Sequence, residues 1–506
     1  MNDYVALLPL LILAYFATLL MVLIAFWRSH AFAFWMTLVG LAAAFVSIGL
    51  TRPISPTGLT PLLRIDAFSL YFTGLVIAGA FLVTLYSCDY LNTHCSPFTD
   101  HCSPAFYPLL MLAVLGMAVI ASSAHWASFF LGLETLSVSL FGLIGYSRDH
   151  KTSLEAALKY LVISAAATAF LLFGIALMYL DSGTMDFRLL GHMLSTGSLT
   201  IMSFFGLAMI LVVFGFKLAI TPFHMWSPDV YQGAPSPVTA LIATGSKGAV
   251  LALLLRFVTI GGLQANDTIY LTITVLAIAT MFVGNLLALL QTNVKRLLAY
   301  SSVAHMGYLL IPLLAGGASG PPSIAFYLVT YFATTILAFG VISVLSSSPL
   351  RITDYASRIT PPSPITYHSS LLTGDLEEID GYRGLASRHP ILAAVFALSL
   401  LSLTGIPPTA GFIAKFYIFS AAAQSGLWTL LIIGIINSGI SAFYYLRLLV
   451  AMYTPSDSPT PPLAPSPPRL ASALSLAIVT AVLLIFGVYP SPLIHLAQSA
   501  MQRLAF

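Results

Sequence analysis

Two lysines flank a proline and a histidine within one long apolar stretch of the chain. The stretch spans 214–250 and contains Lys217, Pro222, His224 and Lys247. A lysine at the centre of a bilayer costs about 2.5–3.5 kcal/mol, so two of them point to a function. Pro222 lacks an N–H and its ring clashes with the carbonyl four residues earlier, which predicts a break in the helix that carries Lys217. Membrane transporters form ion pathways at mid-depth in this way, with buried ions beside broken helices.

Each of these lysines has two possible roles. In a fixed structural ion pair, the lysine would keep its charge permanently. In a proton relay, it would use the neutral amine, which becomes accessible because burial disfavours the charged form. Thr244 lies one turn before Lys247 and Thr239 lies two turns before it. This spacing predicts a hydrated helix face and favours the relay.

One acidic residue, Glu134, lies midway along an apolar segment, with Ser137 one turn further on. Two interpretations stay open, a protonated acid that is hydrogen-bonded between helices and a carboxylate that pairs with a buried lysine. The buried lysines of the same chain favour the second. Lys159 has Glu155 four residues before it, so a surface ion pair and a role in the relay explain it equally well.

Two histidines accompany the lysines. His224 follows Pro222 in the expected helix break, and His305 lies in an apolar segment among polar residues. That polar stripe consists of Ser301, Ser302, His305 and Tyr308. A structural histidine with satisfied hydrogen bonds is one interpretation, whereas a stripe that can bind water favours a relay.

A second interrupted segment repeats the arrangement near the C-terminus. Pro407 and Pro408 break an apolar run, Gly411 is expected to loosen it, and Lys415 follows. Because the seventh and twelfth segments are both broken, segments four to eight and nine to thirteen are predicted to be two copies of one unit. A five-helix unit has an odd number of helices, so the copies would be inverted in the membrane, as in repeat transporters.

The composition places nearly all of the chain in a bilayer, since 58% of its 506 residues are hydrophobic and only 7% are charged. A soluble domain is about 25% charged. Continuous apolar runs of about 20 residues favour an all-α membrane bundle over a barrel. Fourteen spanning segments are expected, at 4–27, 31–50, 65–87, 105–124, 126–146, 154–180, 200–231, 237–261, 269–290, 297–316, 324–346, 391–424, 427–453 and 470–490.

These segments divide the chain into four parts. The expected parts are 1–104 with three helices, 105–262 with the first five-helix repeat, 263–453 with the second, and 454–506 with a proline-rich linker and a final helix. A polar cytoplasmic loop at 346–390 interrupts the second repeat. The first apolar run has no basic region before it and is expected to be retained as a helix. The composition does not suggest a nucleic-acid partner.

The distribution of basic residues predicts the orientation of the chain in the membrane. An even number of helices places both termini on one side, and the positive-inside rule makes that side the periplasm. The cytoplasmic side would then hold Arg28, Arg148, Lys151, Lys295, Arg296, Arg351, Arg358, Arg383, Arg388, Arg447 and Arg469. The outer side would hold Arg52, Arg64, Arg188, Arg256 and Arg503.

The buried charges and the stretches around them also resemble a known family. The chain resembles the antiporter-like membrane subunits of bacterial proton-pumping NADH:quinone oxidoreductase (respiratory complex I), a family shared with multisubunit cation/proton antiporters. The matching stretches are Gly132–Glu134, Phe216–Ser227, Pro235–Lys247, Asn293–Tyr308, Tyr382–Gly384, His389–Leu392 and Gly405–Phe416. The stretch that ends in Lys415 is similar to the subunit N branch, because some sister subunits carry a glutamate there.

The resemblance implies a role for each buried charge. Glu134 would pair with Lys217, Lys247 would be central, and Lys415 would face the outlet or the next subunit. The protein would lie in the bacterial inner membrane and conduct protons beside other membrane-arm subunits, including a neighbouring antiporter-like one, and lipids.

The resemblance implies no cofactor in this chain. NAD, FMN, iron–sulfur clusters and quinone would belong to partner subunits, in keeping with the lack of a dinucleotide fingerprint or a cluster-type cysteine pattern. Two alternatives stay open. One is a subunit of a multisubunit sodium/proton antiporter, and the other is a membrane scaffold whose relay has lapsed.

Three evenly spaced cysteines, Cys88, Cys95 and Cys102, lie in one expected loop with His94 and His101. A metal site there is conceivable, but zinc sites use tighter cysteine pairs. A reduced loop with a small tandem duplication explains the pattern better.

We therefore expect all three cysteines to be dispensable. Replacing them together by serine should leave assembly and turnover of the complex unchanged, since they neither staple the fold nor bind a required metal. Turnover and metal content of the purified complex measure this. Loss of activity together with a stoichiometric metal would favour the metal site instead.

Overall fold

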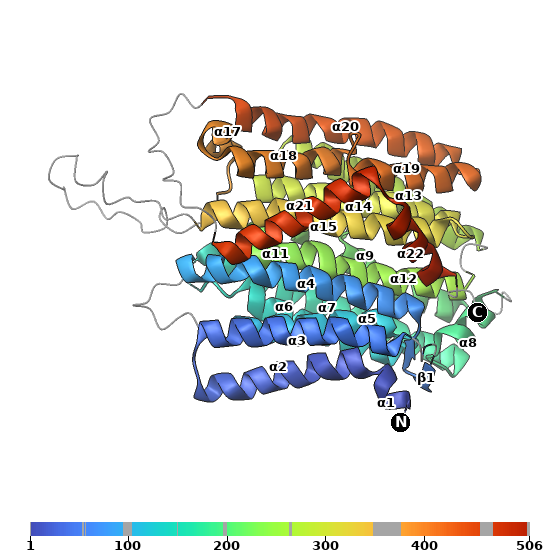
Figure 1. Cartoon of the computed structure of the whole chain (residues 1–506). Helices are drawn as coiled ribbons and strands as arrows, with labels where there is room; N and C mark the ends of the chain where they lie inside the picture. Colours follow the sequence, from blue (N-terminus) through green and yellow to red (C-terminus); the bar gives the residue numbers. More distant parts are fainter. Residues whose placement is uncertain are drawn as a thin grey trace, which may run out of the picture.

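The computed structural model is a bundle of helices that run roughly alongside one another (Figure 1). It describes residues 2–52, 55, 57–94, 104–148, 150–195, 200–262, 266–347, 376–455 and 469–502. The helices of the first half are α1 (Asn2–Ala6), α2 (Leu8–Phe26), α3 (His30–Thr51), α4 (Ala67–His94), α5 (Phe106–Ser122), α6 (Trp126–Ile144), α7 (Lys151–Ser182), α8 (Phe187–Ser195), α9 (Ile201–Leu218), α10 (Trp226–Gly233), α11 (Ser236–Leu241), the π-helical turn η1 (Ile242–Ser246) and α12 (Lys247–Ile260).

The second half continues with long helices and ends in a short one. Its helices are α13 (Asp267–Leu289), α14 (Val294–Ala315), α15 (Gly320–Ser346), the 3₁₀ turn η4 (Ile379–Tyr382), α17 (Leu385–Arg388), α18 (Pro390–Thr404), α19 (Ala410–Gln424), α20 (Trp428–Tyr453), α21 (Leu470–Val488) and α22 (Ser491–Met501). A small antiparallel hairpin, β1 (Thr57–Thr60) and β2 (Leu63–Ile65), precedes α4. The hairpin, α8 and α22 were not expected from the sequence.

Among the described residues, twelve helices are long and apolar enough to cross a membrane, and α5 and α18 are shorter apolar helices. The predicted all-α membrane class is thereby confirmed. The fourteen crossings, the inversion of the two five-helix units and the four-part division of the chain stay predictions. The first and last helices, α1 and α22, lie at the same end of the bundle (Figure 1).

Local sequence signals explain many helix ends. The Asn293 side chain accepts from the backbone N–H of Arg296 at 3.0 Å and caps the start of α14. Asn266 caps α13 by accepting from Thr268 at 3.1 Å. Short polar side chains stabilise helix starts in this way because the first N–H groups have no intrahelical partner. At the other end of α7, Gly183 has a φ of 66°, a left-handed conformation that glycine adopts without strain.

The first predicted break is present between α9 and α10. Ala219 leaves the helix with a φ of 56°, and the Ile220 N–H turns back to the carbonyl of Gly215 at 2.8 Å. The indole of Trp226 donates to the Phe216 carbonyl at 2.8 Å. Side chains thus satisfy backbone groups that the break releases, which a membrane interior requires.

The second break lies between α18 and α19, where Gly405 has a φ of 85°. Pro407 and Pro408 lie in this break, as predicted. Gly411 does not loosen the helix, contrary to expectation, since it lies within the first turn of α19. Its N–H donates to the Ser402 hydroxyl at 3.2 Å, and a Cβ at Gly411 would overlap the Ser402 carbonyl. Glycine is required here because two backbone segments approach closely.

Three helical segments form the centre of the bundle. The apolar windows of α11–α12 and of α14 are 100% buried, and that of α15 is 94% buried. Every other window is buried by 67% or less. The central helices carry Lys247 and His305, so these groups are shielded from lipid on all sides.

Close packing of α5 against α6 generates a testable prediction. A Cβ at Gly116 would lie 2.7 Å from the Leu136 nitrogen and 2.8 Å from the Gly132 carbonyl oxygen. Gly116→Val should therefore force α5 and α6 apart and destabilise the chain by about 1–3 kcal/mol, as overpacking does. The matched control is Gly49→Val on α3, because no atom lies within 4 Å of the added Cβ. Thermal stability of the detergent-solubilised complex measures the difference, and equal stabilities would contradict the packing argument.

Candidate functional site

Lys217 lies at the end of α9 and is 1% exposed. Its Nζ donates to the Ser137 hydroxyl at 2.8 Å. It also donates to Ser164 at 3.1 Å and to Tyr160 at 3.2 Å. The amine lies 5.1 Å from the centres of the Tyr160 and Phe216 rings. All its polar partners are hydroxyls, which can both accept and donate a hydrogen bond.

Glu134 lies near this cluster but is not in direct contact with Lys217. Its carboxylate accepts from the Thr168 hydroxyl at 2.6 Å, and Lys217 is within electrostatic reach. Within the described residues, no ion pair of 4.0 Å or less joins the two. The expected direct pair is thus replaced by hydroxyl groups of α6 and α7. Glu134 is half-buried. It lies one turn from Leu131 and from Val138 on the helix face that points outward, where these two side chains are 59% and 63% exposed.

Lys247 begins α12 and is 0% exposed. Its Nζ donates to the Ser302 hydroxyl at 2.8 Å and lies 5.4 Å from the centre of the Tyr231 ring. Ser302 also bonds to Tyr331 at 2.6 Å and contacts the Tyr231 hydroxyl at 3.4 Å. One serine of α14 therefore joins the lysine to two tyrosines of other helices.

The two threonines before Lys247, which were expected to face water, donate their hydroxyl hydrogens to backbone carbonyls. The Thr244 hydroxyl donates to the Ala240 carbonyl at 2.6 Å, and that of Thr239 donates to Pro235 at 3.2 Å. Threonine in a helix often returns its hydrogen to its own backbone in this way. In addition, η1 inserts a π-helical turn directly before Lys247, so the regular spacing assumed for a helix does not apply.

His305 joins two further tyrosines from within the buried core of α14. Its Nδ1 bonds to the Tyr327 hydroxyl at 2.6 Å, and its Nε2 bonds to Tyr445 at 3.2 Å. The Tyr445 hydroxyl also contacts Ser301. The polar stripe expected on α14 is confirmed, although Ser301 and Ser302 serve different partners.

Lys415 lies on α19 and donates to the Thr404 carbonyl at 2.7 Å and to the Ser438 hydroxyl at 3.0 Å. Its amine lies 5.2 Å from the centre of the Tyr308 ring. His305 is within electrostatic reach of Lys415, and also of the lysine that begins α12.

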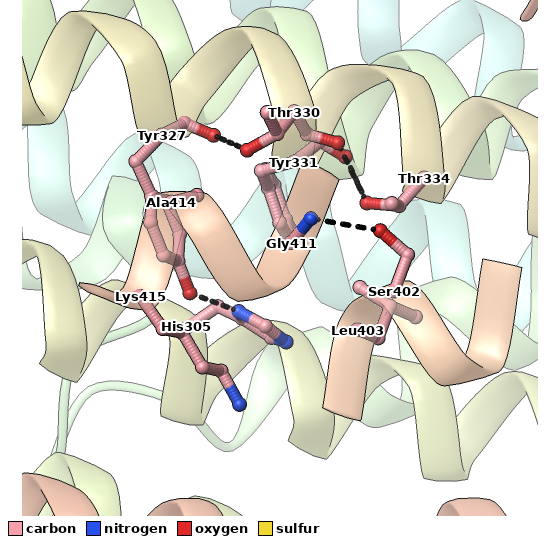
Figure 2. A pocket seen from close by; sticks show the side chains of 10 residues that line it. All are labelled: His305, Tyr327, Thr330, Tyr331, Thr334, Ser402, Leu403, Gly411, Ala414 and Lys415. Atoms are coloured by element: carbon pink, nitrogen blue, oxygen red, sulfur yellow. Dashed lines mark hydrogen bonds between the residues drawn. The ribbon is translucent and has the colours of Figure 1, made fainter. Parts of the chain in front are cut away.

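A small cavity is lined by both Lys415 and His305 (Figure 2). Its lining comes from α14, α15, α18 and α19 and consists of His305, Tyr327, Thr330, Tyr331, Thr334, Ser402, Leu403, Gly411, Ala414 and Lys415. A volume of about 10 Å³ is room for roughly one water molecule. Hydroxyl groups around such a space can hold a water between the histidine and the lysine.

His224 lies in the first helix break and is 6% exposed. Its ring nitrogens have no side-chain partner among the described residues, and only the backbone at Pro222 is close enough to interact. The Thr221 hydroxyl in the same region is also unbonded within the described chain, and Ser227 faces the Tyr231 hydroxyl. Buried polar groups normally have partners, so this break is a suitable place for water.

Lys159 lies apart from the buried groups, with 42% of its side chain exposed. It contacts Glu155 and Asp229 at 2.7 Å each. Asp229 also pairs with Arg296 at 2.7 Å. These ion pairs connect α7 and α14 to α10, so the geometry supports the surface-pair interpretation of Lys159.

A buried cation elsewhere in the chain shows how a structural charge is held. Arg256 is 1% exposed and pairs with Asp66 at 2.7 Å. Arg64 pairs with the same carboxylate at 3.2 Å. By contrast, Lys217, Lys247 and Lys415 have no carboxylate within 4.0 Å among the described residues.

Several hydroxyl groups around the buried ionisable residues were not identified from the sequence. Tyr160, Ser164 and Thr168 recur at every fourth position along α7, and Tyr327 and Tyr331 do so on α15. Side chains four apart share one helix face. A search for polar residues with this spacing inside apolar segments could have found both sets.

Some expectations concern residues outside the described part of the chain. Cys95 and Cys102 are among them, and Cys88 is half-buried at the end of α4. Residues 348–375 of the expected cytoplasmic loop and 456–468 of the expected linker also lie outside it.

The chain is similar in sequence to known membrane subunits. Residues 123–441 match the family model described as NADH:quinone oxidoreductase/Mrp antiporter, TM. The chain is 41% identical over 505 residues to NADH-quinone oxidoreductase subunit N of Ectopseudomonas mendocina (strain ymp), covering 99% of this chain and 97% of that protein.

Solved structures show the same fold. A chain of respiratory complex I from Thermus thermophilus is 33% identical with a TM-score of 0.77, covering 97% of this chain and 99% of that one. A chain of an archaeal membrane-bound sulfane sulfur reductase (24% identity, TM-score 0.81) and one of the Mrp complex from Dietzia sp. (20%, 0.81) each cover 99% of this chain and 98% of their own, and show the fold alone. The full-length identity and the family match together show that the chain belongs to the NADH:quinone oxidoreductase/Mrp antiporter family of membrane subunits, and within it to the subunit N branch of NADH-quinone oxidoreductase.

Proposed function

We propose that the chain conducts protons across the membrane for NADH:quinone oxidoreductase, along a buried path from Glu134 to Lys415. The observation that carries the proposal is the environment of the three lysines. Each is buried and bonded to hydroxyl or carbonyl oxygens, whereas Arg256 has the counter-ion Asp66. A buried cation without a counter-ion is costly, which favours a neutral amine during part of the cycle.

The path has four stations in the order in which we expect protons to pass. They are the Glu134–Lys217 cluster, the Lys247–Ser302 cluster, His305 with its tyrosines, and Lys415. Water at His224 would connect the first two stations, and water in the small cavity would connect the last two. Lys159 lies outside this path, where its ion pairs hold the broken helix in place.

Partner subunits would supply the driving force. The redox groups of the enzyme, NAD, FMN, iron–sulfur clusters and quinone, would be bound there, and a neighbouring antiporter-like subunit would adjoin this chain. Half-buried Glu134 is suited to electrostatic coupling with such a neighbour, because its carboxylate lies at the edge of the bundle. We place the chain in the bacterial inner membrane with both termini in the periplasm. The alternative, a subunit of a sodium/proton antiporter, shares the fold at 20% identity, whereas the 41% identity over the whole chain favours the oxidoreductase.

Lys247→Arg separates a proton carrier from a fixed counter-charge. Arginine keeps the positive charge but essentially never deprotonates in a protein. We expect assembled complex whose pumping is as poor as in Lys247→Ala, at least about tenfold below the unmodified protein, which is the effect of about 1.4 kcal/mol on a barrier. The measurement is initial proton translocation in sealed vesicles, normalised to assembled complex on native gels.

The matched control for this substitution is Arg256→Lys. A lysine at 256 can still pair with Asp66, and a fixed ion pair needs charge only, so pumping should be retained. Wild-type-like pumping by Lys247→Arg would show that charge alone suffices at 247 and would exclude the carrier role.

The first station makes a second prediction. Lys217→Ala should reduce pumping at least about tenfold without preventing assembly, because Glu134 can then take up a proton and stay neutral. Glu134→Gln should impair pumping more than Glu134→Asp, since only aspartate keeps a titratable charge. Dye-monitored vesicle acidification and quinone reductase activity are measured together. Equal pumping by Glu134→Gln and the unmodified chain would instead support a purely structural glutamic acid.

A further inference from the structure

A second buried polar cluster lies next to the proposed path, between α13 and α20. Asn285 and Asn437 are both 0% exposed. The Asn285 amide donates to the Asn437 side-chain oxygen at 3.1 Å and to the Tyr308 hydroxyl at 3.3 Å. Its own side-chain oxygen accepts from Tyr444 at 3.1 Å. Asn437 in turn donates to the Ile433 carbonyl at 3.0 Å.

Both hydrogens of the Asn285 amide are therefore used, and each partner comes from another helix. A buried amide is costly unless its hydrogen bonds are satisfied. Apolar side chains would fill the same space without that requirement. The pair is thus expected to determine how the helices are positioned, as buried polar residues do when they set helix register.

The spacing along α20 connects this cluster to the proton groups. Asn437 and Tyr444 are seven residues apart, two helical turns, and both bond to Asn285. The residue that follows each of them is hydrogen-bonded to a residue of the proposed path. Ser438 accepts from Lys415 at 3.0 Å, and Tyr445 bonds to His305 at 3.2 Å.

Most of the opposite face of α20 is apolar, apart from Arg447, which donates to the Leu289 carbonyl at 3.0 Å and to the Gln291 carbonyl just beyond the end of α13. Ile432, Ile435, Ile436 and Phe443 are 51–73% exposed there. In a membrane, such apolar side chains contact lipid or another helix about equally well, so hydrogen bonds and close packing decide helix position. A rotation or slide of α20 would move Ser438 and Tyr445 together.

We propose that Asn285, with Asn437, is a positioning site that sets the register of α20 and thereby holds Ser438 at Lys415 and Tyr445 at His305. The inference rests on the proposed function, because it assumes that Lys415 and His305 carry protons. Besides each other and Lys247 on α12, the titratable groups that surround these two residues are tyrosines. They are Tyr308 on α14, Tyr327 and Tyr331 on α15, and Tyr445 on α20. Each hydroxyl that moves therefore changes the surroundings of a titrating group.

The test is Asn285→Leu in the whole complex, with pumping per electron measured across a range of pH. Leucine has a similar size but no hydrogen bonds. We expect assembled complex with pumping reduced several-fold and its pH profile shifted by about half a unit or more, the order expected when one membrane hydrogen bond near a titrating group changes. Tyr444→Phe, which removes one hydroxyl, should shift the profile in the same direction by less.

Thr274→Val is the matched control on the same helix, because the Thr274 hydroxyl bonds only to its own helix at Tyr270, 2.8 Å away. It should leave the profile unchanged. The double variant Asn285→Leu/Asn437→Leu should pump no worse than Asn285→Leu alone, because both variants remove the same Asn285–Asn437 interaction. If Asn285→Leu lowers pumping only in parallel with assembly, or leaves the pH profile unchanged, positioning is excluded.

Lys415→Ala, measured alongside, separates the two claims. Reduced pumping by Lys415→Ala with a normal Asn285→Leu variant would overturn the positioning role and leave the proposed function standing. Normal pumping by Lys415→Ala would overturn the function of that station itself, and the positioning role with it.

Discussion

A lysine amine that is buried in a membrane without a counter-ion is the constraint on which the rest of this structure depends. Charge in such a place is costly, so the surrounding helices must supply oxygen atoms at hydrogen-bond distance. In this chain hydroxyls and a backbone carbonyl supply them, around Lys217, Lys247 and Lys415. Hydroxyl partners solvate both the charged and the neutral amine, because they can donate as well as accept.

This constraint explains why the architecture is interrupted where it is. The broken helices free backbone carbonyls near mid-depth, and one of these, at Thr404, is a direct partner of Lys415. The π-helical turn η1 lies directly before Lys247. Such turns often occur at functional sites. The most deeply buried helices, α11–α12, α14 and α15, carry the middle of the proposed path, where the surrounding helices separate it from lipid.

Charges with a structural role are held differently in the same molecule. Arg256 pairs with Asp66, and Lys159 bridges Glu155 and Asp229. Each of these cations has at least one carboxylate within 4.0 Å, which favours its charged form. The difference in partners therefore distinguishes the paired cations from the three lysines of the proposed path more clearly than burial does, since Arg256 is as buried as Lys217.

The sequence by itself determined the membrane class, the two helix breaks and the identity of the buried charges. These depend on local features, namely long apolar runs, prolines that cannot continue a helix, and ionisable residues that are rare in such runs. The tertiary structure alone decided which hydroxyl meets which amine. The separation of Glu134 from Lys217, the return of the Thr244 hydroxyl to its own backbone, and the Asn285–Asn437 lock depend on how helices far apart in sequence rotate against one another. A local pattern shows which face of a helix is polar, but only packing shows what that face contacts, and a single π-helical turn rotates every side chain beyond it.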